Sequence, residues 1–393
     1  MKYIFYLLPC VLNIVIGLLF FITAKRMADA GASSLAVTAT MPMWAFIYAV
    51  ISYVAGKIAT RENAVKILFI SQIILLLSLL GLLLTPSLKL QYLYLFGSGL
   101  GTGLFFTPFQ VIVKLFEKVE LAQETFSRSA AVYTFSWSFG QGTGPLLAAL
   151  IWGAFDPVNG WKYCYMITIG ISIFVLINLF FMQKFIKRRL SEPAAAITAV
   201  DTNNNTLSPD LPDIMKAVWV LSLGGYLAIS VLRSYFPDYA TKVLQLPTSS
   251  QGIMLALISI VQAVSALLCL KARRWQFKPF VPGAVSLLAV TALITVIFST
   301  GSVMAWCAAV MFGLFTGVMC FAMTYHALAN AAKSASYAAG NETIVGGTSV
   351  LAPLMAGLLA DFTTARMPFY VLIAVLAAAT LIYCKMTWKF RNF

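Results

Sequence analysis

The sequence predicts an all-α polytopic membrane protein with twelve transmembrane helices in two pseudo-symmetric six-helix bundles. Three observations lead to this fold class: the composition, the recurrence of long apolar segments, and one polar stretch near the middle of the chain. Of the 393 residues, 61% are hydrophobic and 10% are charged, whereas a soluble domain carries about 25% charged residues. Too little polar surface is present to cover a soluble monomer, so the chain needs a lipid bilayer as its solvent.

Twelve apolar segments have the length that a membrane-spanning helix needs, which is about 20 residues. They are apolar on all faces, unlike the alternating strands of a membrane barrel. Six of them precede the polar stretch and six follow it. We expect the spans at residues 3–24, 37–55, 67–85, 92–113, 129–152, 163–183, 214–236, 252–270, 280–299, 302–327, 337–360 and 369–388.

The first apolar segment is interpreted as a retained helix rather than a signal peptide. It covers residues 3–24, has no small-residue cleavage site and ends at Lys25 and Arg26. The apolar region of a signal peptide is shorter, about 7–15 residues. The segment is therefore counted as the first of the twelve spans.

The longest polar stretch is "KRRLSEPAAAITAVDTNNNTLSPDLPD", Lys187–Asp213. It contains three prolines and a run of asparagines, a composition typical of a flexible linker. It divides the chain almost in half. We therefore predict an N-terminal six-helix bundle at 1–186, a cytoplasmic linker at 187–213 and a C-terminal six-helix bundle at 214–393.

The two halves share a weak internal repeat. "GLGTGLFFT" at Gly99–Thr107 aligns with "GLFTGVMCF" at Gly313–Phe321, with four of nine residues identical. The segments Ala130–Ala149 and Ala338–Gly357 align with five of twenty identical, and the alignment pairs one proline with another. The order and spacing of the matches indicate that the fourth helix corresponds to the tenth and the fifth to the eleventh.

The formal net charge of +14 comes from the loops rather than from a nucleic-acid-binding surface. If the N-terminus lies inside, twenty of the 27 Lys and Arg residues fall on cytoplasmic segments and six on outer segments, with Arg233 inside a helix. Cytoplasmic loops of membrane proteins are enriched in Lys and Arg in this way. We therefore expect both termini in the cytoplasm, an integral protein of a bacterial inner membrane, and no nucleic-acid partner.

Neither a metal site, an enzyme cofactor nor a catalytic cluster is predicted. The six cysteines lie in apolar segments, and no two of them are close in sequence, so we interpret them as small core residues. A membrane-embedded enzyme, the remote alternative class, needs several histidines and acids or a paired nucleophile and base. One histidine and thirteen acids, mostly in loops, give that class little support.

Two motifs carry a resemblance to a known family. The loop after the second span, "GKIATRENAVK", matches the pattern G-x-L-A-D-R-x-G-R-K at Gly56, Ala59 and Arg61, with Thr60 in place of the aspartate and Asn63 in place of the second glycine. The fifth span, "GQGTGPLLAALI", matches the pattern G-x-x-x-G-P-x-x-G-G at its glycines and proline. The matching residues are Gly140, Gly144 and Pro145, and Ala148 and Ala149 stand at the last two glycines.

With its six-plus-six plan, the chain resembles members of the major facilitator superfamily over essentially its full length. The resemblance implies a secondary active transporter that moves a small organic solute by alternating access. The fifth-helix motif is associated in the family with exporters, which favours proton-coupled efflux. Thr60 at the aspartate position, and the absence of an arginine early in the fourth span, weaken the match to drug exporters. The alternative is a facilitator or symporter that imports a sugar, a nucleoside or another nutrient.

The small residues of the fifth span predict a close helix contact. In lipid, small residues let backbones approach, and a neighbouring helix can satisfy the carbonyl that a proline frees. Gly140, Gly144 and Ala148 recur every four residues. We expect this face to pack against a helix of the other half and to slide or tilt during transport, and a static seam is the alternative. The expected counterpart on the eleventh span includes Ala352, Pro353 and Ala356.

Ionisable residues inside spans are costly in lipid and are candidates for function. Glu342 is the candidate proton carrier, because burial in an apolar helix favours its protonated form; the alternative is that it caps the start of its helix. His326, the only histidine, has a comparable depth and is a candidate to pair with Glu342; the alternative is an interfacial histidine that faces water. Arg233 is expected at the outer mouth, with Asp238 as a candidate neighbour, and too distant to pair with Glu342; snorkelling to the interface is its alternative.

Polar uncharged residues at mid-depth are candidate contacts for a substrate. In the family the first, fourth, seventh and tenth helices line the central cavity, with contributions from the second, fifth, eighth and eleventh. A role as helix-packing contacts is the alternative for each. No acidic cage and no cluster of mid-membrane arginines is present, so a neutral, amphipathic or weakly charged solute is expected, handled by a monomer. The candidates are Asn13, Gln110, Tyr133, Tyr226 and Asn341.

Overall fold

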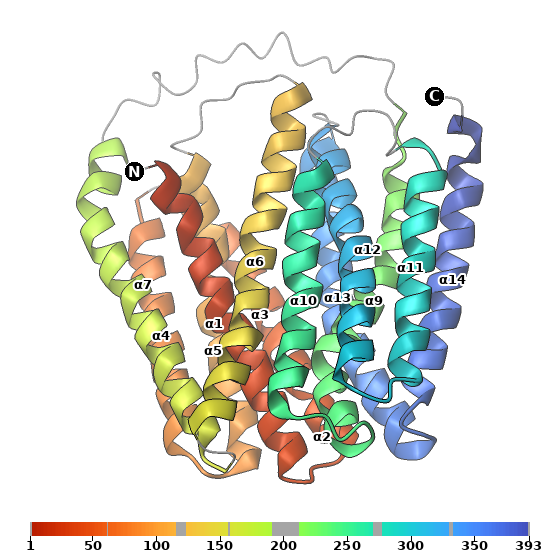
Figure 1. The fold of residues 1–393 in the computed structure, drawn as a ribbon. Coiled ribbons are helices and arrows are strands. Elements are labelled where there is room, and N and C mark those ends of the chain that lie inside the picture. Colours follow the sequence, from red (N-terminus) through yellow and green to blue (C-terminus); the bar gives the residue numbers. More distant parts are fainter. Residues whose placement is uncertain are drawn as a thin grey trace.

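The structure is a computed structural model that describes residues 2–60, 62–114, 123–155, 158–190, 212–269, 277–329 and 333–391. In these ranges twelve long helices run side by side, and no strand is found among the described residues (Figure 1). The all-helical fold class is confirmed. The long helices are α1 (Lys2–Asp29), α3 (Thr40–Ile58), α4 (Ala64–Leu84), α5 (Leu88–Lys114), α6 (Gln123–Phe155), α7 (Gly160–Leu190), α9 (Met215–Lys242), α10 (Thr248–Leu268), α11 (Phe280–Ile297), α12 (Ser302–Ala329), α13 (Ser334–Phe362) and α14 (Met367–Thr387).

Two short elements accompany the long helices. The five-residue helix α2 (Ser34–Thr38) connects α1 to α3, and the 3-10 helix η5 (Trp388–Phe390) follows α14. The labelled N- and C-termini lie at one end of the bundle and α2 lies at the other (Figure 1). We call these the terminal end and the α2 end.

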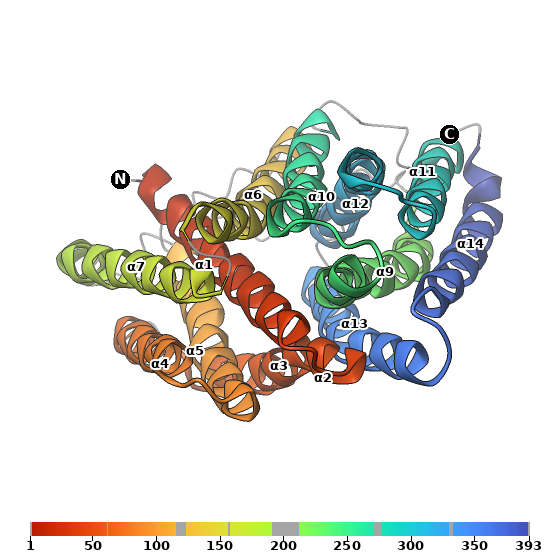
Figure 2. The ribbon, with the colours of Figure 1, turned by 60° about the horizontal axis from the view of Figure 1, so that its bottom comes forward.

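The helices before and after the central stretch form two groups that lie side by side (Figure 2). α6 of the first group lies along α10 of the second, and α13 of the second group lies beside α2 and α3 of the first. The expected linker begins too early, because α7 continues to Leu190. Residues 191–211, most of the expected linker, lie outside the described residues.

The internal repeat is supported by equivalent close contacts in both halves. A Cβ atom added to Gly99 or Gly103 of α5 would lie 2.6 or 2.9 Å from a backbone oxygen of α3. A Cβ atom added to Gly313 or Gly317 of α12 would lie 2.8 or 2.6 Å from a backbone oxygen of α10. The sequence alignment pairs these same glycines. Both halves therefore use a glycine every four residues to bring two helix backbones together.

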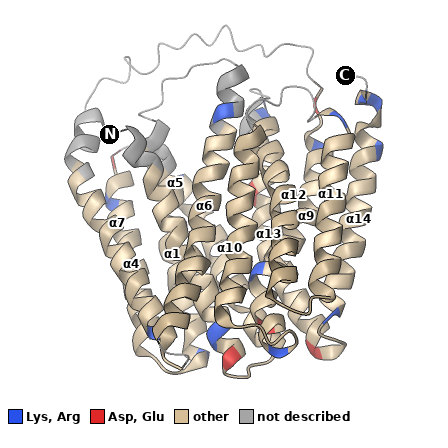
Figure 3. Ribbon diagram, viewed as in Figure 1, with Lys and Arg blue, Asp and Glu red and all other residues tan. Residues whose placement is uncertain are grey.

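The outer faces of the helices are apolar and accessible. Leu77, Phe181, Leu287 and Leu381 are 63%, 72%, 66% and 72% exposed. Soluble monomers rarely expose large contiguous apolar surfaces. The charged residues gather mostly at the two ends of the bundle (Figure 3). Ten of the described helices also pass a combined test of length and hydropathy for a membrane span, so this distribution fits a protein surrounded by lipid.

The helix α6 continues through Pro145 without a break. A proline cannot donate a hydrogen bond to the carbonyl four residues earlier, which here is that of Gln141. Gly17 of α1 lies directly against this oxygen, since an added Cβ atom would be 2.6 Å from it and 3.0 Å from the Pro145 ring. A weak Cα–H···O contact from Gly17 can partly satisfy the freed carbonyl.

Candidate functional site

Glu342 lies among tyrosines from both halves of the molecule. Its carboxyl interacts electrostatically with Tyr48 of α3, Tyr133 of α6 and Tyr226 of α9. Glu342 itself comes from α13. Two candidates from the sequence, Tyr133 and Tyr226, are thus brought close to the candidate proton carrier. Tyr48 was missed, although it lies at mid-depth in the second span just as Tyr133 and Tyr226 do in theirs.

The space around Glu342 is accessible. Tyr133 is 52% exposed and the Glu342 side chain is also exposed. The two residues come from opposite halves yet lie within electrostatic range of each other. An accessible space therefore lies between the halves at this depth.

The Glu342 carboxyl is not a helix cap. α13 begins at Ser334 with Lys333 as its N-cap, so Glu342 is more than two turns inside the helix. The capping alternative is wrong because the helix starts earlier than the apolar pattern indicated. Among the described residues, Glu342 has neither an ion-pair nor a hydrogen-bond partner.

Asn341, next to Glu342, has a packing role in this structure. Its Oδ1 accepts a hydrogen bond from Trp219 Nε1 of α9 at 2.8 Å, and its Nδ2 donates to the Met323 carbonyl of α12 at 3.2 Å. Trp219 also packs edge-on against Tyr337. With both ends of its amide engaged, Asn341 holds α13 against α9 and α12 beside the accessible space.

Of the two remaining mid-depth candidates, the structure describes the side chain of Asn13 alone, and its contacts lie elsewhere. Asn13 is buried, donates to the Pro9 carbonyl of its own helix at 2.8 Å and packs beside Gly140, which is the packing role. The side chain of Gln110 lies outside the described residues.

His326 does not hydrogen-bond to Glu342, so the expected pair is wrong. The imidazole is buried and packs edge-on against Phe277 and Tyr325. Its Nε2 has no hydrogen-bond partner within the described ranges. The sequence placed the two residues at similar depths, but depth carries no information about which side of a helix a residue occupies.

The Gly140 face of α6 has a different partner from the expected one. An added Cβ atom at Gly140 would lie 3.0 Å from Asn13 Cβ, and one at Gly144 would lie 2.6 Å from the Ile14 carbonyl oxygen. Both contacts are with α1 of the same half, so the prediction that this face meets the other half is wrong.

The contact between halves is made by an adjacent face of α6. An added Cβ atom at Gly142 would lie 2.9 Å from the Ala256 carbonyl oxygen of α10, and one at Gly252 of α10 would lie 2.6 Å from that of Pro145. Gln262 Nε2 donates to Ser138 Oγ at 2.6 Å across the same contact. We call this contact the α6–α10 seam. The sequence did not single out Gly142, because it lies between Gly140 and Gly144 and does not belong to the series of small residues at every fourth position.

On α13 the expected small residues are buried. Ala352, Pro353 and Ala356 are all buried. Gly357, the next small residue, lies against Leu35 and Thr38 of α2, with an added Cβ atom 2.6 Å from Leu35 Cα. At the α2 end α13 therefore meets the other half through Gly357, which is not one of the predicted residues.

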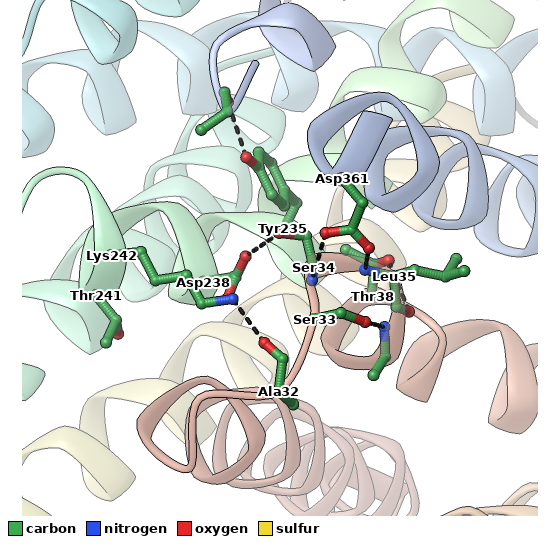
Figure 4. A network of polar contacts seen from close by, with 12 residues as sticks. Ala32, Ser33, Ser34, Leu35, Thr38, Tyr235, Asp238, Thr241, Lys242 and Asp361 are labelled. Carbon is green, nitrogen blue, oxygen red and sulfur yellow. Dashed lines mark hydrogen bonds and ion pairs between the residues drawn. The ribbon is translucent and has the colours of Figure 1, made fainter. Parts of the chain in front are cut away.

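A network of polar contacts joins the two halves at the α2 end (Figure 4). Asp361 of α13 accepts hydrogen bonds from the backbone N–H groups of Ser34 and Leu35, both at 2.9 Å. Asp238 of α9 accepts one from Ser34 Oγ at 2.7 Å and pairs with Lys242 at 2.7 Å. A carboxylate at the first N–H groups of a helix is favourable. We call this network, with α2 at its centre, the α2 closure.

Lys242 completes the α2 closure by donating from Nζ to the Ala32 carbonyl at 2.6 Å. Asp238 therefore engages Ser34 and Lys242 and is not the partner of Arg233. The expected Arg233–Asp238 contact is wrong because the residues are five apart, which turns their side chains about 140° from each other on a helix.

Arg233 instead reaches toward α10. Its Nη2 donates to Ser259 Oγ at 3.4 Å, and its guanidinium interacts electrostatically with Tyr226 and Cys320. It lies about 27 Å along α9 from Met215, whereas Glu342 lies about 12 Å along α13 from Ser334. Tyr226, about 17 Å along α9 by the same measure, interacts with both charged groups, so it lies between them along the length of the bundle.

The loop after α3 keeps its turn without the aspartate of the motif. The Thr60 N–H donates to Asn63 Oδ1 at 2.7 Å, and Asn63 Nδ2 donates to the Ile58 carbonyl at 2.7 Å. Gly56 has room, since an added Cβ atom would find Thr107 no closer than 3.7 Å. Arg61 lies outside the described residues.

The described helices surround an accessible polar region between two similar halves, which is the geometry of a membrane transporter. The model of the Major Facilitator Superfamily matches residues 5–341. The chain therefore belongs to the major facilitator superfamily. A search of curated protein sequences finds no match.

Solved structures with the same fold are distant in sequence. A bacterial homologue of the human lysosomal transporter Spinster, in an inward-facing and unoccupied conformation, matches with a TM-score of 0.75 and 16% identity over 100% of this chain and 97% of that chain. The E. coli xylose transporter XylE, in a partially occluded inward-open conformation, matches with 0.69 and 12% over 98% and 97%. The human organic anion transporter MFSD10 matches with 0.62 and 12% over 96% of each chain. These likenesses concern the fold.

Proposed function

We propose that this transporter exports a small organic solute in exchange for protons, with Glu342 as the proton carrier. The observation that carries the proposal is the setting of Glu342. It is an accessible carboxyl between the two halves, it interacts with tyrosines of both, and no basic group pairs with it in the described part of the chain. Such a carboxyl can take up a proton in one state of the transporter and release it in the other.

The orientation follows from the distribution of basic residues. The rule that Lys and Arg are enriched on cytoplasmic segments puts both termini inside, so the α2 end faces outward in this proposal. The α2 closure then seals the outer end. The accessible region around Glu342 lies nearer the terminal end and is reached from the cytoplasm. This arrangement is that of an inward-facing state of a transporter in a bacterial inner membrane.

The experiment uses everted membrane vesicles that carry an acid interior. Compounds that stabilise the purified protein in thermal melts are added, and the pH gradient is followed with a fluorescent weak base. Exchange of solute for protons should dissipate the gradient in vesicles with the unmodified chain. Glu342→Gln mimics the protonated acid, so it should keep the thermal stabilisation but lose at least tenfold of the gradient-dependent flux.

The matched control is Glu62→Gln, which makes the same change at an acid in the loop after α3. It should behave like the unmodified chain. Full gradient-driven flux in Glu342→Gln would remove the proton-carrying role. Uptake driven by the opposite gradient would indicate an importing symporter, and flux without any response to pH would indicate a facilitator.

A further inference from the structure

Arg233 is a cation inside a membrane-spanning helix without a carboxylate to balance it. It lies on α9, which extends from Met215 to Lys242, and its side chain is only partly accessible. Within the part of the chain that the structure describes, no carboxylate lies at ion-pair distance from it. An unpaired charge in such a place is costly, so a partner for the guanidinium is expected.

The two nearest candidates for that partner are engaged or distant. Asp238 pairs with Lys242 and accepts from Ser34 on the other side of the helix. Glu342 lies about 15 Å nearer the terminal end by helix rise, and its electrostatic neighbours are the tyrosines. Among the residues that the structure describes, Arg233 is therefore not one half of an internal salt bridge.

The groups around Arg233 are hydrogen-bond donors. Ser259 Oγ accepts from the guanidinium at 3.4 Å, which leaves its own O–H free to donate. The Tyr226 hydroxyl makes a 3.3 Å contact with Cys320 Sγ, a weak partner that a stronger acceptor can replace. The guanidinium hydrogen-bonds to Ser259 and interacts electrostatically with Tyr226, so one guanidinium and two hydroxyls on α9 and α10 offer donors to a common acceptor.

We propose that Arg233, Ser259 and Tyr226 bind a carboxylate group of the transported solute. The planar guanidinium matches a carboxylate with two parallel hydrogen bonds. One positive charge balances a single negative charge, whereas a phosphate dianion brings a surplus charge into the interior. The solute is therefore an organic monocarboxylate, or a larger molecule with one carboxylate at this end. This inference rests on the proposed function, because it names the class of solute that the transporter carries.

The position of this site suits a solute that alternates between the two sides. Ser259 lies at the α6–α10 seam, since an added Cβ atom at Gly142 would be 3.0 Å from Ser259 Cβ. A carboxylate on Arg233 therefore lies next to the contact between the halves and beyond Glu342 as seen from the terminal end. The site lies deeper than the accessible space around Glu342, at the buried side chains of Ser259 and Tyr226, beside the helices that must move when the other side opens.

The test measures binding without transport, so it is independent of proton coupling. The purified full-length protein is melted in the presence of acetate, benzoate and decanoate, together with benzamide and benzylamine as neutral and cationic analogues. At least one carboxylate should raise the melting temperature in a saturable manner, and the amide and amine should not. Arg233→Gln should weaken the apparent affinity for that carboxylate at least tenfold, and Arg128→Gln, the matched control at the accessible residue Arg128, should leave it unchanged.

Ser259→Ala removes one donor with little change in shape and serves if Arg233→Gln does not fold. It should weaken carboxylate binding several-fold without affecting the melting temperature of the free protein by more than a few degrees. The proposal is overturned if no carboxylate stabilises the unmodified chain, if benzoate and benzamide stabilise it equally, or if carboxylate binding survives both substitutions. Carboxylate binding without pH-driven flux would leave the binding site in place and count against the proton exchange alone.

Discussion

The two contacts between the halves differ in the way they are built. The α6–α10 seam brings backbones together at Gly142 and Gly252 and adds the Gln262–Ser138 hydrogen bond between buried side chains. The contact between α13 and α2 is close at Gly357 and is held by the carboxylate of Asp361. Toward the terminal end α13 becomes accessible, and Glu342 lies in that accessible part.

This difference indicates which of the two contacts can open at a modest cost in free energy. Close packing along the α6–α10 seam is lost all at once if the helices separate, because dispersion contacts fall off within a fraction of an ångström. The Asp361 carboxylate at the α2 closure is exposed, so its hydrogen bonds can exchange one by one for hydrogen bonds to water, at a net cost of about 1.5–3 kcal/mol each. We infer that the α6–α10 seam stays in contact as a pivot while the α2 closure breaks and reforms.

The largest effect is expected when the seam is filled. Gly252→Leu places a side chain against the Pro145 carbonyl and Ala149 of the other half, and overpacking of this kind costs about 1–3 kcal/mol or more. The two halves must then move apart, so transport should be abolished and the melting temperature should fall. Thermal melts and the vesicle flux assay measure both.

Gly153→Leu is the matched control for the filled seam, because an added Cβ atom at Gly153 of α6 meets nothing within 4 Å. It should melt and transport like the unmodified chain. If Gly252→Leu transports at the normal rate, the seam is not a tightly packed pivot and the comparison between the two contacts fails.

An intermediate effect is expected when the α2 closure is weakened. Asp361→Asn removes the charge that accepts two backbone N–H groups of α2, and a hydrogen bond to a charged group contributes about 1.5–3 kcal/mol. Loss of about 1.4 kcal/mol changes the ratio of closed to open molecules tenfold. Spin labels at Ala30 and Thr364, both exposed at the α2 end, should show a larger share of long distances.

Asp29→Asn tests whether any lost carboxylate at the α2 end has this effect. Asp29 pairs with Lys25 on its own helix, so its removal should leave the distance distribution between the labels unchanged. Equal distributions in Asp361→Asn and the unmodified chain would show that Asp361 does not hold the halves together.

The smallest effect is expected at a polar contact outside both inter-half contacts. Asp213 accepts from Tyr337 and pairs with Lys333 at 3.2 Å within the C-terminal half. Partial burial tends to raise the pKa of Asp213, but hydrogen bonds from Tyr337, the Met215 N–H and Lys333 outweigh it and hold the pKa below its usual value. Because the pKa is lower in the folded state, the ionised carboxylate stabilises the fold at any pH above its unfolded-state pKa, about 3.9. This stabilisation is lost as the pH falls through the folded-state pKa.

Asp213→Asn should therefore lower the melting temperature by a degree or two at pH 7, since exposed pairs contribute less than about 1 kcal/mol. The difference from the unmodified chain should shrink as the pH falls below about 4. The spin-label distances at the α2 end should not change. A shift in those distances would mean that the terminal end and the α2 closure are coupled through the C-terminal half.

The sequence by itself determined that the chain lies in a lipid bilayer, how many spans it has, and which helices of the two halves correspond. Each of these follows from properties that are local along the chain: apolar length sets a span, and a repeated motif such as Gly99 and Gly313 sets an equivalence. The family followed from the motifs together with this plan. The choice of Glu342 as the acid of interest also came from the sequence, because an acid within an apolar helix is costly wherever the helix lies.

Only the tertiary structure decided which residues meet. A helix turns a side chain by about 100° per residue, so an error of one residue in register changes its neighbour. This is why His326 faces Phe277 rather than Glu342, why Gly140 faces α1 while Gly142 faces α10, and why Arg233 reaches Ser259 rather than Asp238. The α2 closure was hidden for a further reason: its hydrogen bonds join residues more than 200 positions apart, and no local pattern records a contact over that separation.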